Sequence, residues 1–329
     1  MRSIIDNAKL KYKSVNKFNS LINFRQNKLV EKISEARKEI SLFDYEALTC
    51  SIPTNKRFLI PENNLYGNGY KLLNYKSKID FNNSGIEHGF IYGSLVQDFH
   101  LKSWTTHVVT FSDYRKDIIN KKLKKEVICV GPYIHYADYI LGEDELMTLK
   151  NSLGKVLLVF PQHSIAGANV NYSTDKFIDY VKSFRSSYDS IIICLYWHDI
   201  RMKKHLPYIN SGFKVVSAGH SNDIFFLDRL KTIYYLSDNI LTNSVGTHVG
   251  YSIFMNKPLK IIEQKVQINI EGKSKKENTQ RCLSDKESLL EVKSQIIDLF
   301  TDRSFDLITK EQYQFISDLF GFKYAEKGQ

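Results

Sequence analysis

Residues 236–262 read LSDNILTNSVGTHVGYSIFMNKPLKII and contain one complete strand–loop–helix–strand pattern. The short apolar run 239–242 predicts a buried strand, and the apolar segment 249–255 predicts a helix. Residues 259–262 predict a second strand. Because two strands joined by a crossover helix lie parallel in one sheet, this segment predicts a parallel sheet.

The loop between this strand and its helix carries small and polar residues, among them Asn243, Ser244, Gly246 and Thr247. The first N–H groups of a helix have no partner inside the helix, and the positive end of the helix dipole lies at the same place. The loop therefore predicts an anion site that suits a phosphate group. The alternative is that Asn243 or Ser244 only caps the helix.

The same alternation of strands and helices extends over most of the 329 residues, which is long enough for two domains. We expect an N-terminal α/β domain with a helical extension at 1–140, a Rossmann-like domain at 141–283, and helices at 284–329 that pack back on the domains. Further strands are expected at 86–92, 106–111, 126–130, 156–160, 190–196 and 213–217, and a polar surface loop at 263–283. The predicted class is α/β, with two Rossmann-like domains, parallel sheets flanked by helices, and extra N-terminal helices.

The formal charge of +10 suggests an anionic partner, which can be nucleic acid, a membrane surface or a substrate. The chain has no nucleic-acid-binding signature, so we expect no nucleic acid partner. The segment 21–42 has an apolar stripe at helical spacing and a basic opposite face, which predicts either a docking helix or peripheral contact with an anionic inner membrane. Without a signal-peptide pattern or an apolar run of about 20 residues, we expect a cytoplasmic protein.

The four cysteines lie far apart, without the paired spacing of a zinc or disulfide framework, and we expect reduced thiols. Four of the nine histidines follow successive predicted strands: His163, His198, His220 and His248. One histidine at a strand end is usually structural. Four of them would all lie along one edge of the sheet, the one formed by the carboxyl ends of its strands, where parallel sheets bind ligands. This placement predicts a shared site.

Polar companions stand beside these histidines along the same edge: Ser164, Arg201, Ser221, Asn243 and Ser244. A metal site is the alternative, because imidazole binds zinc, copper and iron. However, the sequence has no HxH or HExxH spacing, and adjacent strands about 4.8 Å apart would spread four ligands along an edge. We therefore expect no metal and no cofactor, and instead hydrogen bonds to a nucleotide.

The chain resembles GT-B glycosyltransferases of bacterial capsule, lipopolysaccharide and teichoic-acid assembly. The resemblance covers about residues 85–265 and rests on Thr242-Asn243-Ser244, Gly246, Tyr251 and Asn256-Lys257-Pro258. It implies that the loop Ser244–Thr247 holds the phosphate of the donor. It also implies that the loops at His163-Ser164 and His220-Ser221 line the donor site.

Glu87-His88-Gly89 resembles the His-Gly element that teichoic-acid glycerophosphotransferases use near the acceptor. The resemblance implies that His88 is the catalytic base, a task for which an imidazole that titrates near neutrality is suited. Glu87 would orient His88 or be the base itself.

Together these features predict a metal-independent, inverting glycosyltransferase that transfers a sugar from a nucleotide-sugar to a cell-surface glycan or lipid-linked acceptor. Inversion is expected because the EX7E pattern of retaining enzymes is not evident. The alternatives are a glycerophospho- or pyruvyl transferase, a nucleotide-sugar epimerase, and a non-catalytic subunit of a polysaccharide assembly complex.

Overall fold

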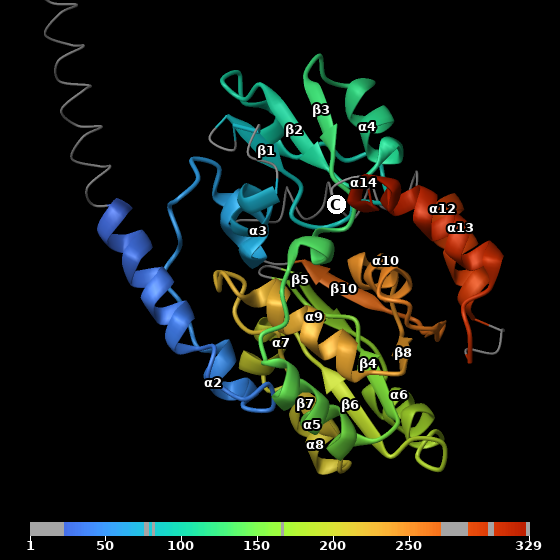
Figure 1. Ribbon diagram of the computed structural model, residues 1–329. Coiled ribbons are helices and arrows are strands. Elements are labelled where there is room, and N and C mark those ends of the chain that lie inside the picture. Colours follow the sequence, from blue (N-terminus) through green and yellow to red (C-terminus); the bar gives the residue numbers. More distant parts are fainter. Residues whose placement is uncertain are drawn as a thin grey trace, which may run out of the picture.

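The computed structural model describes residues 23–75, 79–80, 83–165, 168–270, 289–301 and 306–326 (Figure 1). The first part comprises a helix at 23–36, α2 (Tyr45–Thr49), η1 (Pro61–Gly67), α3 (Asn68–Tyr75), β1 (Ser84–Ile86), η2 (Asp98–Leu101), β2 (His107–Thr110), α4 (Asp113–Asn120), β3 (Glu126–Cys129) and η3 (Tyr133–Tyr136). Its three strands form one parallel sheet in the order β1-β2-β3.

The second part holds a five-stranded parallel sheet. Its elements are α5 (Glu143–Leu153), β4 (Val156–Phe160), β5 (Ala168–Asn171), α6 (Thr174–Lys182), β6 (Ser190–Cys194), α7 (Trp197–Arg201), α8 (Leu206–Asn210), β7 (Lys214–Val216), α9 (Phe226–Leu236), β8 (Asn239–Thr242), α10 (Thr247–Phe254), β9 (Leu259–Ile261) and β10 (Gln267–Ile270). The chain ends in α12 (Leu289–Phe300), α13 (Lys310–Phe320) and α14 (Lys323–Glu326).

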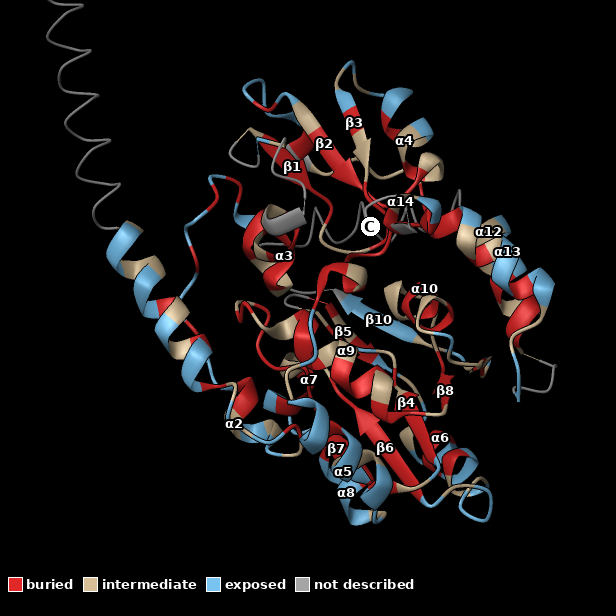
Figure 2. Cartoon of the chain, in the orientation of Figure 1, coloured by how far each residue is buried: buried red, intermediate tan, exposed pale blue. Residues whose placement is uncertain are grey.

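The strand order of the larger sheet is β7-β6-β4-β8-β9. The chain adds β6 and β7 on one side of β4 and then returns to place β8 on the other side, so the sheet reverses its winding between β4 and β8. Ligands of open parallel sheets bind at this reversal, beyond the carboxyl ends of the strands. Val156–Phe160 and Ser190–Cys194 are almost wholly buried, as the apolar runs of a strand covered on both faces require (Figure 2).

The predicted α/β class with two parallel sheets is confirmed, and the strands at 156–160 and 239–242 have the predicted bounds. The segment 86–92, expected to be a strand or the end of one, contains only the end of β1, because the sheet ends at Ile86 and the chain then turns toward a buried ion pair. The loop expected at 263–283 is also wrong in part, because 267–270 form β10, which pairs antiparallel with β5. Residues 271–283 lie outside the described residues, and the predicted domain boundaries stay a prediction.

The C-terminal helices link the two sheets (Figure 1). The ring of Phe320, at the end of α13, stacks on Phe90 beyond β1, with 4.1 Å between ring centroids. A Cβ on Gly250 of α10 would lie 2.2 Å from the Phe320 ring, so only glycine allows this approach. Phe320 therefore fixes α10 relative to the segment that follows β1.

The N-terminal helix docks on the second part of the chain, with Val30 and Ser34 fully buried. The docking alternative is thus observed for the described part of 21–42, and membrane contact stays a prediction. No helix in the described ranges is both long and apolar enough to cross a bilayer.

Candidate functional site at the domain interface

Helix α10 begins at Thr247, with Gly246 as its N-cap and no capping hydrogen bond from the N-cap side chain to its first N–H groups. The alternative that Asn243 or Ser244 caps this helix is therefore wrong. Asn243 instead accepts a hydrogen bond from the Gln162 N–H (2.7 Å) and donates one to Gln264 (2.8 Å). It thus joins the segments that follow β4, β8 and β9, and it holds the loop in front of α10.

His248 shapes the same loop from inside. Its Nε2 lies 3.1 Å from the Ser244 carbonyl oxygen, which can only accept, so the network assigns the proton to Nε2. The ring stacks on Phe160, with centroids 5.5 Å apart. Burial, and next the proximity of His163, lowers the pKa of His248 to about 4, so the ring is neutral near pH 7.

The segment that carries His88 lies directly against the start of α10. The Phe90 N–H donates to the Thr247 hydroxyl (2.9 Å), and the Tyr92 hydroxyl donates to the Gly246 carbonyl (2.8 Å). A Cβ on Gly89 would lie 3.3 Å from the Thr247 hydroxyl oxygen. The two motifs that the sequence singled out, 157 positions apart at Phe90 and Thr247, thus meet across the interface between the two sheets.

Glu87 is fully buried and bound to Arg115 of α4. The Arg115 guanidinium donates to both carboxylate oxygens of Glu87 (2.5 and 3.1 Å), and the Thr110 hydroxyl donates to one of them (2.6 Å). Burial raises the pKa of a carboxyl group, but the opposing charge and hydrogen bonds of Arg115 leave the pKa of Glu87 below its ordinary value. With its oxygens engaged in this way, Glu87 fits the orienting role and not the role of base.

Arg115 also holds the far end of the His88 segment. Its guanidinium donates to the carbonyl oxygens of Gly93 (2.7 Å) and Leu95 (2.9 Å). Both ends of residues 87–95 are therefore fixed by one buried side chain, and His88 lies on a rigid turn between them.

Two tyrosines that the sequence analysis did not select complete the surroundings of His88. Tyr66 places its ring 6.0 Å from the His88 ring, and its hydroxyl lies 3.0 Å from that of Tyr196 beyond β6. The Tyr66 backbone has a φ of 58°, a conformation that is strained for a tyrosine. No sequence signal indicated that Tyr66, in η1, would turn toward His88.

His163 and Ser164 are separated by the fold. His163 is exposed, and its ring lies 4.9 Å from that of Tyr196, so it faces the interface. Ser164 is fully buried; its hydroxyl accepts from the Val170 N–H and from Lys204 (2.7 Å). Ser164 thus supports β5 and does not reach the site, contrary to the role that the resemblance implies.

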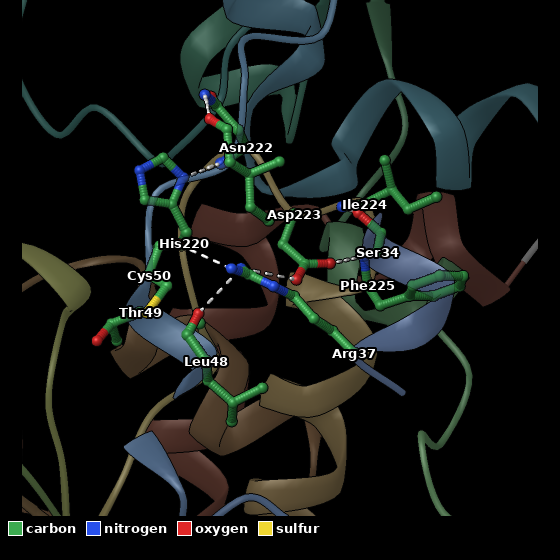
Figure 3. A network of polar contacts seen from close by, with 12 residues as sticks. Ser34, Arg37, Leu48, Thr49, Cys50, His220, Asn222, Asp223, Ile224 and Phe225 are labelled. Carbon is green, nitrogen blue, oxygen red and sulfur yellow. Dashed lines mark hydrogen bonds and ion pairs between the residues drawn. The ribbon is translucent and has the colours of Figure 1, made fainter. Parts of the chain in front are cut away.

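His220 lies at the far end of the same edge, beneath the N-terminal segment (Figure 3). Its backbone N–H donates to Leu48 O (3.1 Å), and its Nδ1 accepts from Asn222 N (3.1 Å). Burial, and next the Arg37 and Arg201 charges, lowers the pKa of His220 to about 4. His220 is therefore neutral near pH 7, and its backbone N–H and Nδ1 are both engaged in hydrogen bonds.

Arg37 fixes the turn that follows His220. It donates to the Cys50 carbonyl (3.1 Å) and lies 3.9 Å from Asp223 (Figure 3). Asp223 also pairs with the buried Arg229. These contacts fix the turn at 219–225, from which the Ser221 carbonyl accepts the Tyr66 N–H (2.7 Å). Of the two residues in the predicted His220-Ser221 loop, only Ser221 contacts the surroundings of His88.

His198 and Arg201 lie on α7 beside Trp197, whose ring is 4.4 Å from that of His220. The Arg201 guanidinium lies 5.6 Å from the Trp197 ring and 3.4 Å from the Ser51 hydroxyl. All four histidines do follow the carboxyl ends of parallel strands, but the fold divides them. His163 and His248 lie near α10, and His198 and His220 lie under the N-terminal segment.

A cavity of about 560 Å³ opens at the carboxyl ends of β4, β8 and β9, beside the start of the Ser244–Thr247 loop. Ser244 and Val245 form one wall, and Lys293 and Ile297 of α12 form another. Within the described ranges, no three His, Cys, Asp or Glu side chains cluster closely enough to hold a metal ion. The described cysteines, Cys50, Cys129 and Cys194, are free thiols, and Cys282 lies outside the described residues.

No protein-family model matches the chain, and no curated protein matches its sequence. Solved structures match it at low identity. The pneumococcal O-GlcNAc transferase GtfA, in complex with UDP and GlcNAc, is 10% identical with a TM-score of 0.35, over 74% of this chain and 50% of that one. This chain therefore spans only half the length of GtfA.

The UDP-GlcNAc 2-epimerase from Neisseria meningitidis, bound to UDP-GlcNAc, is 13% identical with a TM-score of 0.35, over 79% of this chain and 71% of that one. The wall teichoic acid polymerase TagF is 14% identical with a TM-score of 0.32, over 68% of this chain and 59% of that one. Because these TM-scores lie below 0.5, we base the functional proposal on the residues of this chain alone.

The Glu87–Arg115 pair gives a prediction on stability. Glu87→Gln leaves the Arg115 charge buried without its counterion, which should lower the free energy of unfolding by about 3–5 kcal/mol at pH 7. A lowered carboxyl pKa contributes stability above the unfolded pKa of about 4.3, and that stability is lost as the pH falls through the folded pKa. In urea unfolding, the difference from wild type should therefore shrink at acidic pH.

The control is Glu126→Gln, in the same sheet, where the carboxylate is exposed and pairs with His107. It should change stability by less than about 1 kcal/mol. Equal stability of Glu87→Gln and wild type at pH 7 would contradict the assignment, as would a difference that is independent of pH.

Proposed function

We propose that this chain is a glycosyltransferase that transfers a sugar from a nucleotide-sugar to a hydroxyl group of a cell-surface glycan or lipid-linked acceptor. One observation carries the proposal. The hydrogen bonds from Phe90 and Tyr92 to Thr247 and Gly246 bring a histidine loop against an uncapped helix start. A proton acceptor and an anion-binding group are the two parts that transfer of a sugar from a phosphate requires.

In this proposal the donor phosphate binds at the first turn of α10 and the Ser244–Thr247 loop. His88 removes the proton from the acceptor hydroxyl, whose oxygen attacks the anomeric carbon. The bond from that carbon to the phosphate oxygen breaks, and the departing phosphate takes the electron pair. The N–H groups and dipole of α10 then stabilise its negative charge, so the reaction needs no metal. Because the acceptor displaces the phosphate in a single step, the anomeric centre is inverted.

The roles of the other predicted residues follow from where they lie. Asn243 and His248 hold the phosphate loop in shape, and Glu87 orients the turn of His88. We assign His163 and Ser221 to the lining of the site, because His163 packs on Tyr196 and Ser221 accepts from Tyr66. We assign a supporting role at the strand ends to Ser164, His198, Arg201 and His220. The charge of +10 is consistent with an anionic acceptor, and we propose that the protein meets it at the inner face of the plasma membrane.

Nucleotide binding is the first test. UDP, CMP, GDP, dTDP, CDP and their sugars should each be added to the purified protein, and its melting temperature measured with and without EDTA. One nucleotide series should raise the melting temperature, because a ligand of the native state stabilises it by about 2.7 kcal/mol at 100 times its Kd. EDTA should not change the shift.

A panel without any shift would contradict the proposal and favour a non-catalytic subunit. A shift that EDTA abolishes would contradict metal independence.

The role of His88 is tested with the donor that the panel identifies. His88→Ala should keep the nucleotide shift but lower release of nucleotide from the donor, with octyl glycosides as acceptors, by about 10²–10⁴-fold. His107→Ala in the neighbouring strand, where the ring pairs with the exposed Glu126, is the matched control and should keep activity.

Unchanged turnover of His88→Ala would remove His88 from the mechanism. Conversion of the donor sugar in the absence of any acceptor would indicate an epimerase.

A further inference from the structure

The cavity beside the Ser244 loop is bounded by a helix from the C-terminal part of the chain. Its walls come from the segments that follow β4, β8 and β9, and from Lys293 and Ile297 on α12. Its volume of about 560 Å³ lies within the range of pockets for small organic ligands. No residue of α12 was selected from the sequence as part of a site.

Lys293 lies next to Tyr92, a residue of the segment that carries His88. Its ammonium nitrogen lies 5.8 Å from the centroid of the Tyr92 ring. The hydroxyl of that tyrosine donates to the Gly246 carbonyl (2.8 Å), at the N-cap of α10. The C-terminal helix thus brings a cation next to the loop between β8 and α10.

The lining of the cavity has an apolar part and a charged part. Val245, Ile262, Val266 and Ile297 offer apolar surface, which suits the face of a base and the carbon side of a ribose. The Ser244 hydroxyl and the Lys293 ammonium offer donors for phosphate oxygens. Glu263 and Lys265 also line the cavity, but both are exposed, where water and salt screen their opposite charges, whereas Lys293 is half-buried.

We propose that this cavity binds a nucleoside diphosphate and that Lys293 of α12 contacts its phosphate oxygens. The inference rests on the proposed function and goes beyond it. It names the phosphate-binding cation of the donor site and assigns it to the C-terminal helix. It also states the ligand class, because a cation aimed at phosphate distinguishes a diphosphate from its nucleoside.

Calorimetric titration with uridine, UMP and UDP, and with the matching cytidine, guanosine and thymidine series, tests the proposal on the full chain. Lys293→Met should weaken binding of the preferred diphosphate by about tenfold or more, as expected for loss of a charge-assisted hydrogen bond. Binding of the corresponding nucleoside should change by less than about twofold. Lys293→Arg keeps the charge and should retain diphosphate affinity within about threefold.

Lys310→Met, at the exposed first residue of α13, removes the same charge from the neighbouring helix outside the cavity and should have no effect. If wild type binds a nucleotide but Lys293→Met binds the diphosphate as tightly, the inference is wrong and the proposed function stands. Equal weakening of nucleoside and diphosphate would also overturn it, because Lys293 would then only support the cavity wall. If wild type binds no nucleotide, both proposals fail.

Discussion

The hydrogen bond from the Phe90 N–H to the Thr247 hydroxyl, with its companion from Tyr92 to Gly246, joins the two parallel sheets at one point. Through this contact, a histidine that follows a strand of one sheet becomes the neighbour of a helix that follows a strand of the other. Each motif alone has an ordinary structural explanation. Their juxtaposition is what allows a proton acceptor and an anion-binding group to act on one substrate.

The surrounding structure fixes this contact from both sides. Arg115 anchors both ends of residues 87–95 within the first sheet, through Glu87 on one side and the Gly93 and Leu95 carbonyls on the other. The Phe320 ring wedges between Phe90 and Gly250, so α13 holds α10 and the His88 segment at a set separation. Buried charge and tight packing thus both place His88 and stabilise the structure around it.

The sequence predicted the parts of this arrangement that depend on local patterns. The apolar runs at 156–160 and 239–242 predicted buried parallel strands. The four histidines do follow the carboxyl ends of strands, but the fold divides them into two groups, so the shared site expected of all four stays a prediction. Periodicity contains no information on which buried carboxylate meets which arginine, so Glu87 was considered as a base although Arg115 binds it. The expectation that Ser164 lines the donor site has the same weakness, because only the three-dimensional packing turns its hydroxyl toward Lys204.

Tyr66 and Lys293 could not be found from sequence because nothing local distinguishes them. The left-handed backbone of Tyr66 is imposed by contacts with a distant turn, where Ser221 accepts its N–H. Lys293 reads as an ordinary polar residue of an amphipathic helix, and only the docking of α12 brings it to the cavity. Residues that complete a site from another part of the chain are therefore the ones that pattern analysis misses.

The meeting of the two loops is tested most directly by cross-linking. A Cβ on Gly89 would lie 3.3 Å from the Thr247 hydroxyl oxygen, so Gly89→Cys with Thr247→Cys places two sulfurs within reach of a disulfide. In a background with Cys50→Ser, which removes the exposed thiol among the described cysteines, and Cys282→Ser, mild oxidation should consume both new thiols and form an intramolecular disulfide detectable by mass spectrometry. Gly142→Cys with Thr247→Cys, where the glycine has no neighbour within 4 Å, should stay reduced. A Gly89–Thr247 cysteine pair that stays equally reduced would contradict the account.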